Sequence, residues 1–339
     1  MRRILIVGAL VCLGISTMAR ADVQRGQATL AWLTISANAR DAAMGNTAVF
    51  TDENASAAFQ NPAGLGRIQR GNVYVDYTKW LAEMSVADLA VAYRVPQIGT
   101  FALAVRSMNY GDFQFTKLAT NVAGYEDLTS SDVGTVGGWM FGLGYGRMLT
   151  DKFTVGGEIK YASDKLGQMT TVDRQGNITQ NSKATVSGFL LDFGTNYNTG
   201  WKSLNLSMAI QNFGTQKGAS NGREEFTAPL IFKVGVAADV LDFLGMEDAP
   251  AGLTVRMEGT DPRDEREGFN IGSEFVYNLS DGLQTAVRGG WSRREAGGLS
   301  FGAGVGGTFG GTHATLDWAY SDYGSTLGAV NRAGLSVSF

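Results

Sequence analysis

Cysteine and histidine are almost absent from this chain of 339 residues. Cys12 is the only cysteine and lies close to the N-terminus, and His313 is the only histidine. A disulfide needs two cysteines, and the common zinc sites need several cysteine or histidine ligands. We therefore expect neither a disulfide nor a metal site, and we expect no cofactor.

Long apolar runs and prolines are also scarce. The chain has five prolines, and no stretch beyond residue 21 approaches the ~20 consecutive apolar residues that a membrane helix needs. Any membrane span would therefore have to be made of strands. Glycine is abundant instead, with 46 residues, and the mean hydropathy is −0.05 although 10% of the residues are aromatic. This balance is typical of strands that have one apolar face and one small or polar face.

Residues 1–21 have the features of a cleaved secretory signal. Arg2 and Arg3 precede an apolar run, and Ala19-Arg20-Ala21 is a small-residue cleavage site. Cleavage would remove three arginines, so that the balance of 28 basic and 32 acidic residues becomes 25 and 32, a net charge of −7. An acidic exported chain of this kind is not expected to bind nucleic acid.

From residue 71 onward, large apolar residues alternate with small or polar ones. The clearest examples are residues 139–146 and 230–237. A period of two predicts strands, and many of the segments approach the ~9–11 residues of a tilted membrane strand. The predicted strands are 71–81, 84–95, 99–109, 138–149, 153–163, 184–198, 202–213, 229–240, 252–260, 268–280, 283–293, 298–309, 312–322 and 332–339.

The connections between these strands alternate in length. Most even-numbered connections are short turns, whereas the long ones (110–137, 164–183, 214–228, 261–267 and 323–331) all fall on the other side. Outer-membrane barrels show this asymmetry. The turn at 241–251 is an exception that the pattern does not explain. Phe339 ends the last strand and is predicted to be the assembly signal that the barrel-assembly machinery reads.

These patterns predict an all-β fold: a transmembrane antiparallel β-barrel of about 14 strands over residues 71–339, in contact with outer-membrane lipid. A barrel of this size is wider than the eight-stranded barrels that side chains fill. Residues 22–70 are the natural filler, as a small N-terminal helical hatch in the lumen. We expect a short helix capped by Thr51 or Asp52 and ended by Asn61-Pro62, because a residue before proline avoids the helical region.

The inward faces of the predicted strands carry both signs of charge. Seven acidic and six basic residues are nearly balanced, which favours a paired network that braces the plug over an ion-selective pore. The predicted network comprises Asp88, Arg94, Arg106, Glu158, Lys160, Asp192, Lys233, Asp239, Arg256, Glu258, Glu274, Arg288 and Asp317.

The segments ARDAAMGNTAVF and ENASAAFQNPAGLG resemble the N-terminal hatch shared by FadL-type fatty-acid channels and the PorV/PorQ family. In that family an Asn-Pro-Ala motif lies at the end of the plug, which assigns Asn61, Pro62, Ala63 and Gly64 to a hatch motif. Farther on, AIQNFG, FNIGSEFVYN, VRGGWS, GLSFGAGVG and ATLDWAYSDYG follow the PorV/PorQ order. The resemblance covers nearly the whole mature chain and implies a FadL-like barrel of 14 strands in the outer membrane of a diderm bacterium.

The resemblance implies two non-enzymatic functions. PorV serves type IX secretion by receiving exported proteins, so one hypothesis is a docking role for secreted proteins. The other is a FadL-like passive channel for hydrophobic small molecules. A soluble periplasmic β-sandwich that acts as a binding protein is the alternative from another class.

Signals for enzymatic or metal chemistry are weak. Residues 302–307 fit G-x-G-x-x-G but lie within a predicted strand with no helix after it. No G-x-S-x-G nucleophile elbow accompanies His313. The charged run at 261–267 is interpreted as a solvated loop, so we predict no catalytic residue.

Overall fold

The structure is a computed structural model that describes residues 28–50, 53–120, 126–172, 178–218, 225–246, 248–280, 282–293 and 298–339. The predicted signal peptide (1–21) and the predicted cap residues Thr51 and Asp52 lie outside this part of the chain. Within it, no helix is long and apolar enough to cross a bilayer.

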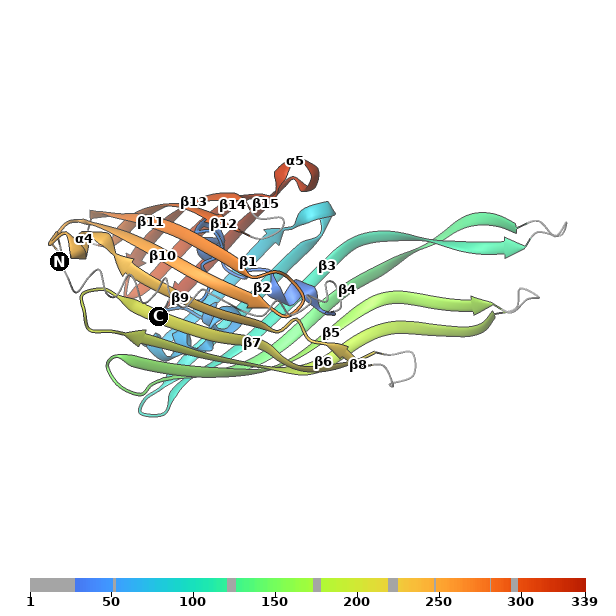
Figure 1. Cartoon of the computed structure of the whole chain (residues 1–339), viewed down its shortest axis with the longest axis horizontal. Helices are drawn as coiled ribbons and strands as arrows, with labels where there is room; N and C mark the ends of the chain where they lie inside the picture. Colours follow the sequence, from blue (N-terminus) through green and yellow to red (C-terminus); the bar gives the residue numbers. More distant parts are fainter. Residues whose placement is uncertain are drawn as a thin grey trace.

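A closed antiparallel β-barrel dominates the molecule (Figure 1). Each strand pairs with its neighbour in the chain, and β1 pairs with β15 from Asn72↔Ser338 to Lys79↔Asn331, which closes the ring. The short β8 (Glu225–Thr227) pairs with β7 and is not a strand of the ring. The strands of the ring are β1 (Gly71–Lys79), β2 (Ser85–Val95), β3 (Gly99–Thr120), β4 (Glu126–Met148), β5 (Phe153–Val172), β6 (Ile178–Asn198), β7 (Asn205–Gly218), β9 (Ile231–Asp239), β10 (Ala251–Pro262), β11 (Gly268–Ser280), β12 (Leu283–Ser292), β13 (Leu299–Phe309), β14 (Thr312–Asp322) and β15 (Ala329–Ser338).

The two faces of the wall differ as the alternation predicts. On β3, Phe101 and Leu103 are 49% and 60% exposed, whereas Ala102 and Ala104 between and beside them are buried. Large apolar side chains on the outside of a closed barrel face lipid, because in water they would form one large exposed patch. The predicted barrel of 14 strands is confirmed, and the β-sandwich alternative is wrong because the first and last strands are hydrogen-bonded.

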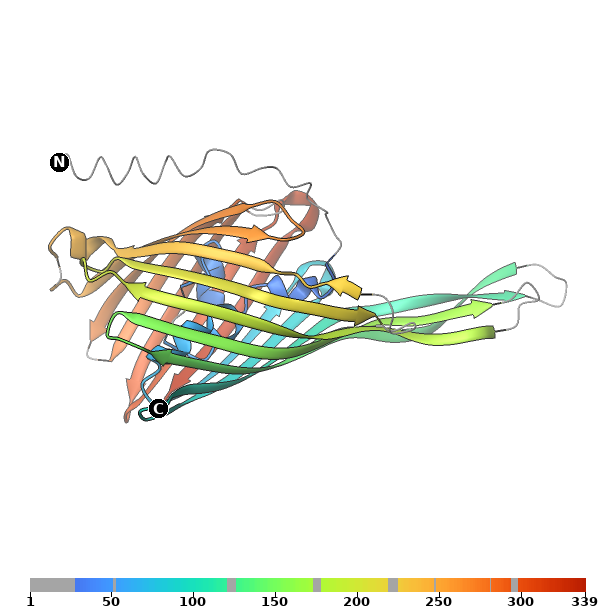
Figure 2. The same cartoon turned by 60° about the horizontal axis from the view of Figure 1, so that its bottom comes forward.

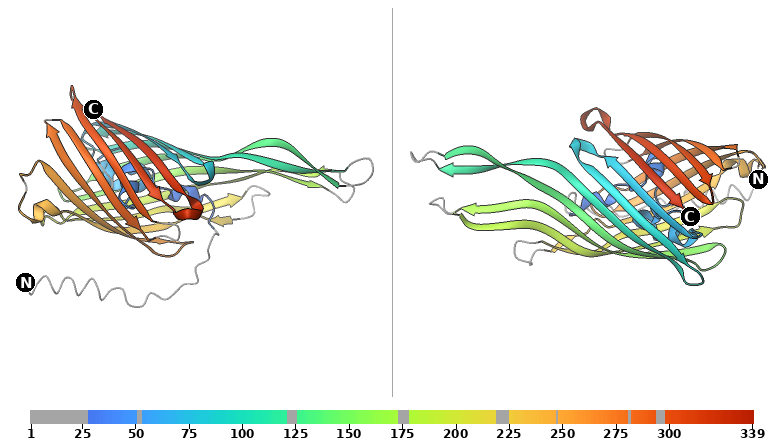
Figure 3. Two further views of the ribbon diagram at one scale, coloured as in Figure 1. Left: turned by 90° about the horizontal axis from the view of Figure 1, so that it is seen from above. Right: turned by 180° about the vertical axis from the view of Figure 1, so that it is seen from behind.

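The two ends of the barrel are unequal. Short turns follow β2, β4 and β13 at the end that holds Phe339, and the opposite end carries two long hairpins (Figures 1 and 3). These hairpins correct the sequence analysis, which assigned 110–137 and 164–183 to loops. The strands β3 to β6 continue through most of these residues. Residues 126–136 are polar and rich in Ser and Thr, so they lack the apolar alternation by which the other strands were found.

The unexplained turn at 241–251 contains a short helix, α4 (Val240–Phe243). The Asp239 carboxylate caps it by accepting a hydrogen bond from the Leu241 amide at 2.8 Å. Asp242 accepts from the Ser203 amide at 2.6 Å and from Lys202 Nζ at 3.3 Å. The longer turn therefore ties two neighbouring turns together. Asp239 is a helix cap here, which corrects its assignment to the lumen network.

Candidate functional site

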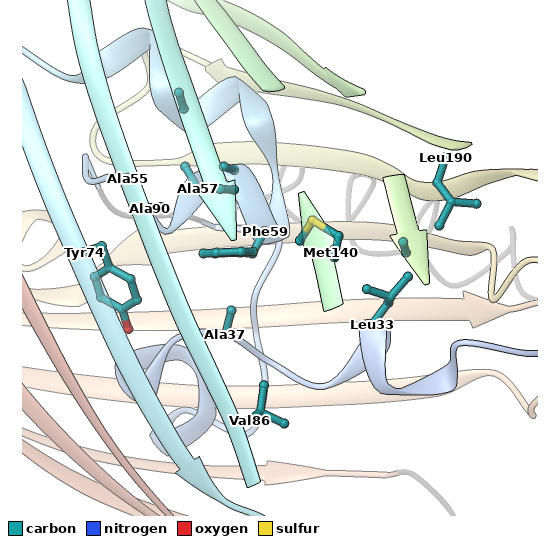
Figure 4. Packing of buried hydrophobic residues seen from close by; sticks show 14 of the residues in the cluster. Leu33, Ala37, Ala55, Ala57, Phe59, Tyr74, Val86, Ala90, Met140 and Leu190 are labelled. Carbon is teal, nitrogen blue, oxygen red and sulfur yellow. The ribbon is translucent and has the colours of Figure 1, made fainter. Parts of the chain in front are cut away.

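The N-terminal segment, described over residues 28–50 and 53–68, lies inside the barrel (Figures 2 and 3). It contains η1 (Ala31–Thr34), α2 (Ala39–Ala43), α3 (Ala57–Gln60) and η2 (Pro62–Arg67). Its three leucines, Phe59 and several alanines join one buried cluster with Ala90, Met140 and Leu190 of the wall (Figure 4), and the alanines of α2 form a second cluster with Ala319. This cluster gives the barrel an apolar core, which an empty lumen would not have.

Helix α3 begins later than the sequence predicted. It starts at Ala57, and Asn54 Oδ1 accepts from the Ser56 amide at 2.9 Å just before it. Residues 53–56 are not helical, so the helix covers fewer residues than the sequence predicted; the predicted cap residues themselves lie outside the described part of the chain. The predicted stop is confirmed, because the helix ends at Gln60 and Asn61 has an extended backbone before Pro62.

Glycines on the inner wall let the segment approach the strands closely. A Cβ on Gly194 would lie 1.8 Å from Asn61 Oδ1, and one on Gly156 would lie 2.2 Å from the Pro62 carbonyl oxygen. On the opposite wall a Cβ on Gly290 would lie 2.2 Å from the Gly45 amide. Real Cβ atoms do not approach so closely, so the segment is fitted against bare backbone on both sides.

The Asn61–Gly64 run lies at one of these contacts. Asn61 Oδ1 accepts from the Ala63 amide at 3.1 Å and caps η2. Asn61 Nδ2 donates to the Val49 carbonyl at 2.9 Å and to Asn196 Oδ1 at 3.1 Å. One amide side chain therefore joins two parts of the segment to β6.

Most of the predicted lumen charges are buried. The structure buries Asp88, Arg106, Glu158, Lys160, Asp192, Lys233, Arg256, Glu258, Glu274 and Arg288, and leaves Arg94, Asp239 and Asp317 half-buried. Their contacts fall into three groups along the segment.

Arg106 forms the first group, with Asp88 and η1. Its Nε and Nη2 donate to the two Asp88 oxygens at 2.6 and 3.0 Å. Its Nη1 donates to the Ile35 carbonyl at 2.8 Å and to the Leu33 carbonyl at 3.3 Å. Arg106 is therefore a clamp between the wall and the backbone of the segment.

The second group surrounds α2. Arg40 and Arg288 both pair with Glu274, with Arg288 Nε 2.5 Å from its carboxylate, and Arg288 Nη1 also donates to Asp317 at 2.7 Å. These contacts tie the helix to β11, β12 and β14.

Arg256 of β10 connects α2 to another part of the wall. It donates to Asp41 at 3.0 Å and to the Phe50 carbonyl at 2.8 Å. Burial raises the pKa of the Asp41 carboxyl to about 6, although the Arg256 and Arg40 guanidiniums act to lower it. The sequence analysis missed Arg40 and Asp41, because a period of two finds charges on strands and not in a short helix.

The third group consists of charged residues on the remaining strands, several of which contact the segment. Lys160 pairs with Asp192 at 2.6 Å, and Asp192 also accepts from the Asn212 amide at 2.7 Å. Glu258 accepts from the Val49 amide at 2.7 Å. Lys233 donates to Gln60 Oε1 at 3.4 Å, and Arg94 donates to the Ile68 carbonyl at 3.5 Å. The Glu158 oxygens make no hydrogen bond to any residue that the structure describes.

Three buried wall charges were missed, namely Asp76, Asp164 and Arg332. Asp76 accepts from Tyr74 and Thr78 hydroxyls at 3.1 Å each. Arg332 donates to the Ser36 carbonyl at 3.1 Å and lies over the Trp80 ring. The alternation around Val75 and Tyr77 could have identified Asp76, because both neighbours are exposed apolar residues.

A cavity of about 650 Å³ opens at the end with the long hairpins. Its apolar lining includes Leu30 and Trp32 of the segment and Trp80, Met84 and Met108 of the wall. Its volume lies within the ~300–1,000 Å³ that is common for small-molecule pockets. We call it the outer cavity.

A second cavity, of about 260 Å³, lies near the short turns. Its lining is mainly polar and includes Arg40, Gln284, His313, Thr315 and Ser336. We call it the inner cavity. Different parts of the N-terminal segment line the two cavities, so the segment lies between them.

The described residues include no cluster of His, Cys, Asp and Glu that could hold a metal ion. His313 Nδ1 lies 2.9 Å from Thr308 Oγ1 across the β13–β14 turn. Residues 302–307 lie within β13, which has no helix after it.

Comparison with known proteins shows the fold. No family model matches the chain, and no curated protein matches it. The toluene transporter TodX of P. putida superposes with a TM-score of 0.56 at 12% identity, over 89% of this chain and 98% of TodX. The Ralstonia pickettii toluene transporter TbuX superposes with a TM-score of 0.51 at 15% identity, over 88% of this chain and 96% of TbuX. The CymD monoaromatic hydrocarbon channel superposes with a TM-score of 0.52 at 11% identity, over 90% of this chain and 98% of CymD.

These solved structures share the closed β-barrel fold with the chain, and they are transporters or channels. At these identities the likeness concerns the fold alone. It does not extend to PorV/PorQ membership.

Proposed function

We propose that the protein is a passive outer-membrane channel for hydrophobic small molecules, with the outer cavity as its entry site. The observation that carries this proposal is the apolar cavity of about 650 Å³ at one end of a closed barrel. Apolar solutes gain ~25 cal/mol for each Å² of surface that they remove from water. The FadL-like fold and the hydrocarbon transporters that share it support the same function.

The N-terminal segment acts as a hatch in this proposal. It separates the outer and inner cavities and is held by the Arg106 clamp and by the ion pairs of α2. The segment contacts the wall closely at Gly156, Gly194 and Gly290, and in this proposal a solute passes when part of the segment moves. Binding in the outer cavity is then the first step of passage.

The type IX docking role stays a prediction from the sequence. The solved structures compared above are toluene transporters and a monoaromatic hydrocarbon channel. Co-purification with secreted proteins that share a C-terminal domain would support that role over solute passage.

Uptake of labelled toluene tests the channel. The full chain would be expressed in a bacterial strain without a hydrocarbon channel, and uptake by whole cells would be measured. Met108→Trp places a large ring in the outer cavity, whereas Leu103→Trp on the same strand points to lipid. We expect uptake with the wild type and with Leu103→Trp, and its loss with Met108→Trp. Equal uptake by all three and by cells without the protein would overturn the proposal.

A further inference from the structure

Four arginines lie where the N-terminal segment joins the wall, at the end of the barrel with the short turns. Arg67 ends η2 and Arg70 immediately precedes β1, whereas Arg94 and Arg147 lie near the ends of β2 and β4. The Arg94 amide donates to the Arg70 carbonyl at 2.7 Å. The Arg147 backbone lies against Gly66, because a Cβ on Gly66 would be 2.9 Å from the Arg147 N and C atoms. We call these four residues the arginine rim.

The arginine rim has no acidic counterpart in the part of the chain that the structure describes. Arg106 in the lumen pairs with an aspartate, but no residue of the rim forms an ion pair with a described residue. Arg70 and Arg147 are exposed, and Arg67 and Arg94 are half-buried. A local excess of one charge on an otherwise acidic chain attracts a ligand of the opposite charge. We therefore expect the rim to bind an anion.

Exposed apolar side chains accompany the rim at the same end of the barrel. Each of them is within two positions of a rim arginine or packs beside one; they are Tyr93, Leu149 and Phe339. Phe339 lies next to Arg70, because a Cβ on Gly71 would be 2.5 Å from the Phe339 ring. Aromatic side chains of barrels lie at the membrane–water interface, and short turns lie on the periplasmic side. The rim is therefore at the height of lipid headgroups.

We propose that the arginine rim binds the phosphate group of an anionic phospholipid, whose acyl chains lie on the lipid-facing wall. Guanidinium N–H groups donate to phosphate oxygens in pairs, which makes arginine well suited to this group. Arg67 belongs to the segment, whereas Arg94 and Arg147 belong to the wall, so a bound headgroup joins the end of the segment to the barrel. This site is separate from both cavities and does not depend on what the channel carries.

Lipid binding to the full-length protein in detergent tests the inference. Phosphatidylglycerol and phosphatidylcholine with identical acyl chains would be titrated, and the bound lipid would be measured by native mass spectrometry. Both lipids carry a phosphate, but the choline group cancels its charge, so the comparison isolates the net negative charge. An arginine near an anionic lipid surface contributes about fivefold in affinity. We expect phosphatidylglycerol to bind at least about tenfold more tightly than phosphatidylcholine.

The variant Arg70→Gln/Arg147→Gln removes the two exposed arginines. Their side chains make no hydrogen bond to any described residue, so the barrel should still assemble, as migration on unheated gels would show. Affinity for phosphatidylglycerol should fall about 25-fold, since two factors of about five are lost. Arg70→Lys/Arg147→Lys keeps the charge and should retain most of the preference.

A matched control removes the same charge at the opposite end of the barrel. Lys79 and Lys165 are exposed near the far ends of β1 and β5, and Lys79→Gln/Lys165→Gln should leave the lipid preference unchanged. The wild-type preference should also weaken as the salt concentration rises, because salt screens exposed charges. A preference that does not depend on salt would contradict an electrostatic site.

Competition distinguishes the lipid from other anions. Inorganic phosphate or an oligoglutamate peptide would be added to the complex with phosphatidylglycerol, and neither should displace the lipid at an equal concentration. Displacement by phosphate would indicate a site for a free anion, and displacement by the peptide would indicate an acidic protein partner, and either result would overturn the inference. Equal binding of the two lipids would overturn it too, as would an unchanged preference in Arg70→Gln/Arg147→Gln. Toluene uptake tests the channel function separately.

Discussion

Removal of the Arg106 clamp should release the N-terminal segment and make the barrel leak. Arg106 is 2% exposed and holds Asp88 through two hydrogen bonds, while it also binds the backbone of the segment at Ile35 and Leu33. Arg106→Leu keeps the apolar stem and removes every one of these contacts. It also leaves Asp88 buried with no cation in direct contact.

The size of the effect follows from the buried pair. Removing one partner of a buried ion pair typically costs ~3–5 kcal/mol. If this free energy is lost from the packing of the segment inside the barrel, the fraction of molecules with a released segment rises about a hundredfold to several thousandfold. Each ~1.4 kcal/mol corresponds to a factor of ten. A state that is rare in the wild type then becomes frequent enough to produce openings in a single-channel recording.

Conductance in planar bilayers is the assay, with Arg106→Leu and the double variant Arg106→Leu/Asp88→Leu compared with the wild type. The double variant removes the unpaired carboxylate but still lacks the contacts to the segment, so it should leak less than the single variant and more than the wild type. Lys152→Leu, at an exposed turn, is the control. A silent Arg106→Leu channel, with Trp32 fluorescence unchanged, would refute the clamp.

Other predictions concern contacts of the segment and closure of the barrel. Gly156→Ala should lower the thermal midpoint and increase leakage because its Cβ would meet the Pro62 carbonyl at 2.2 Å, whereas Gly157→Ala, with its nearest atom at 3.5 Å, should leave both unchanged; equal effects would contradict the fit. Asn61→Leu should also increase leakage but still permit assembly, as gel migration would show, because it removes the bonds to Val49 and Asn196. Phe339→Glu should reduce the amount of folded barrel in membrane fractions, and normal amounts would argue against an assembly role.

The sequence predicted the wall of the barrel well for a physical reason. Lipid outside and a packed lumen inside impose opposite demands on adjacent residues, so Phe141 is 57% exposed while Met140 is 2% exposed. That contrast also placed Asp88 and Arg106 on the inner face. It disappears beyond residue 110, where β3 and β4 leave the ring, so the hairpins were assigned to loops.

The partners within the lumen could not be predicted. Trp32 and Asp164, or Arg40 and Glu274, are far apart in the chain and come together only when the segment packs inside a closed ring. The charge balance indicated that pairs would exist but not which ones. The cavities follow from the same packing and have no local sequence signal.

The most direct test of the channel is the location of a bound hydrocarbon. Crystals of the full chain soaked in 4-bromotoluene would show the bromine by its anomalous scattering. The account predicts a bromine position within the outer cavity, between Trp32 and Met108. Bromine found only on the lipid-facing surface, or nowhere in the lumen, would contradict it.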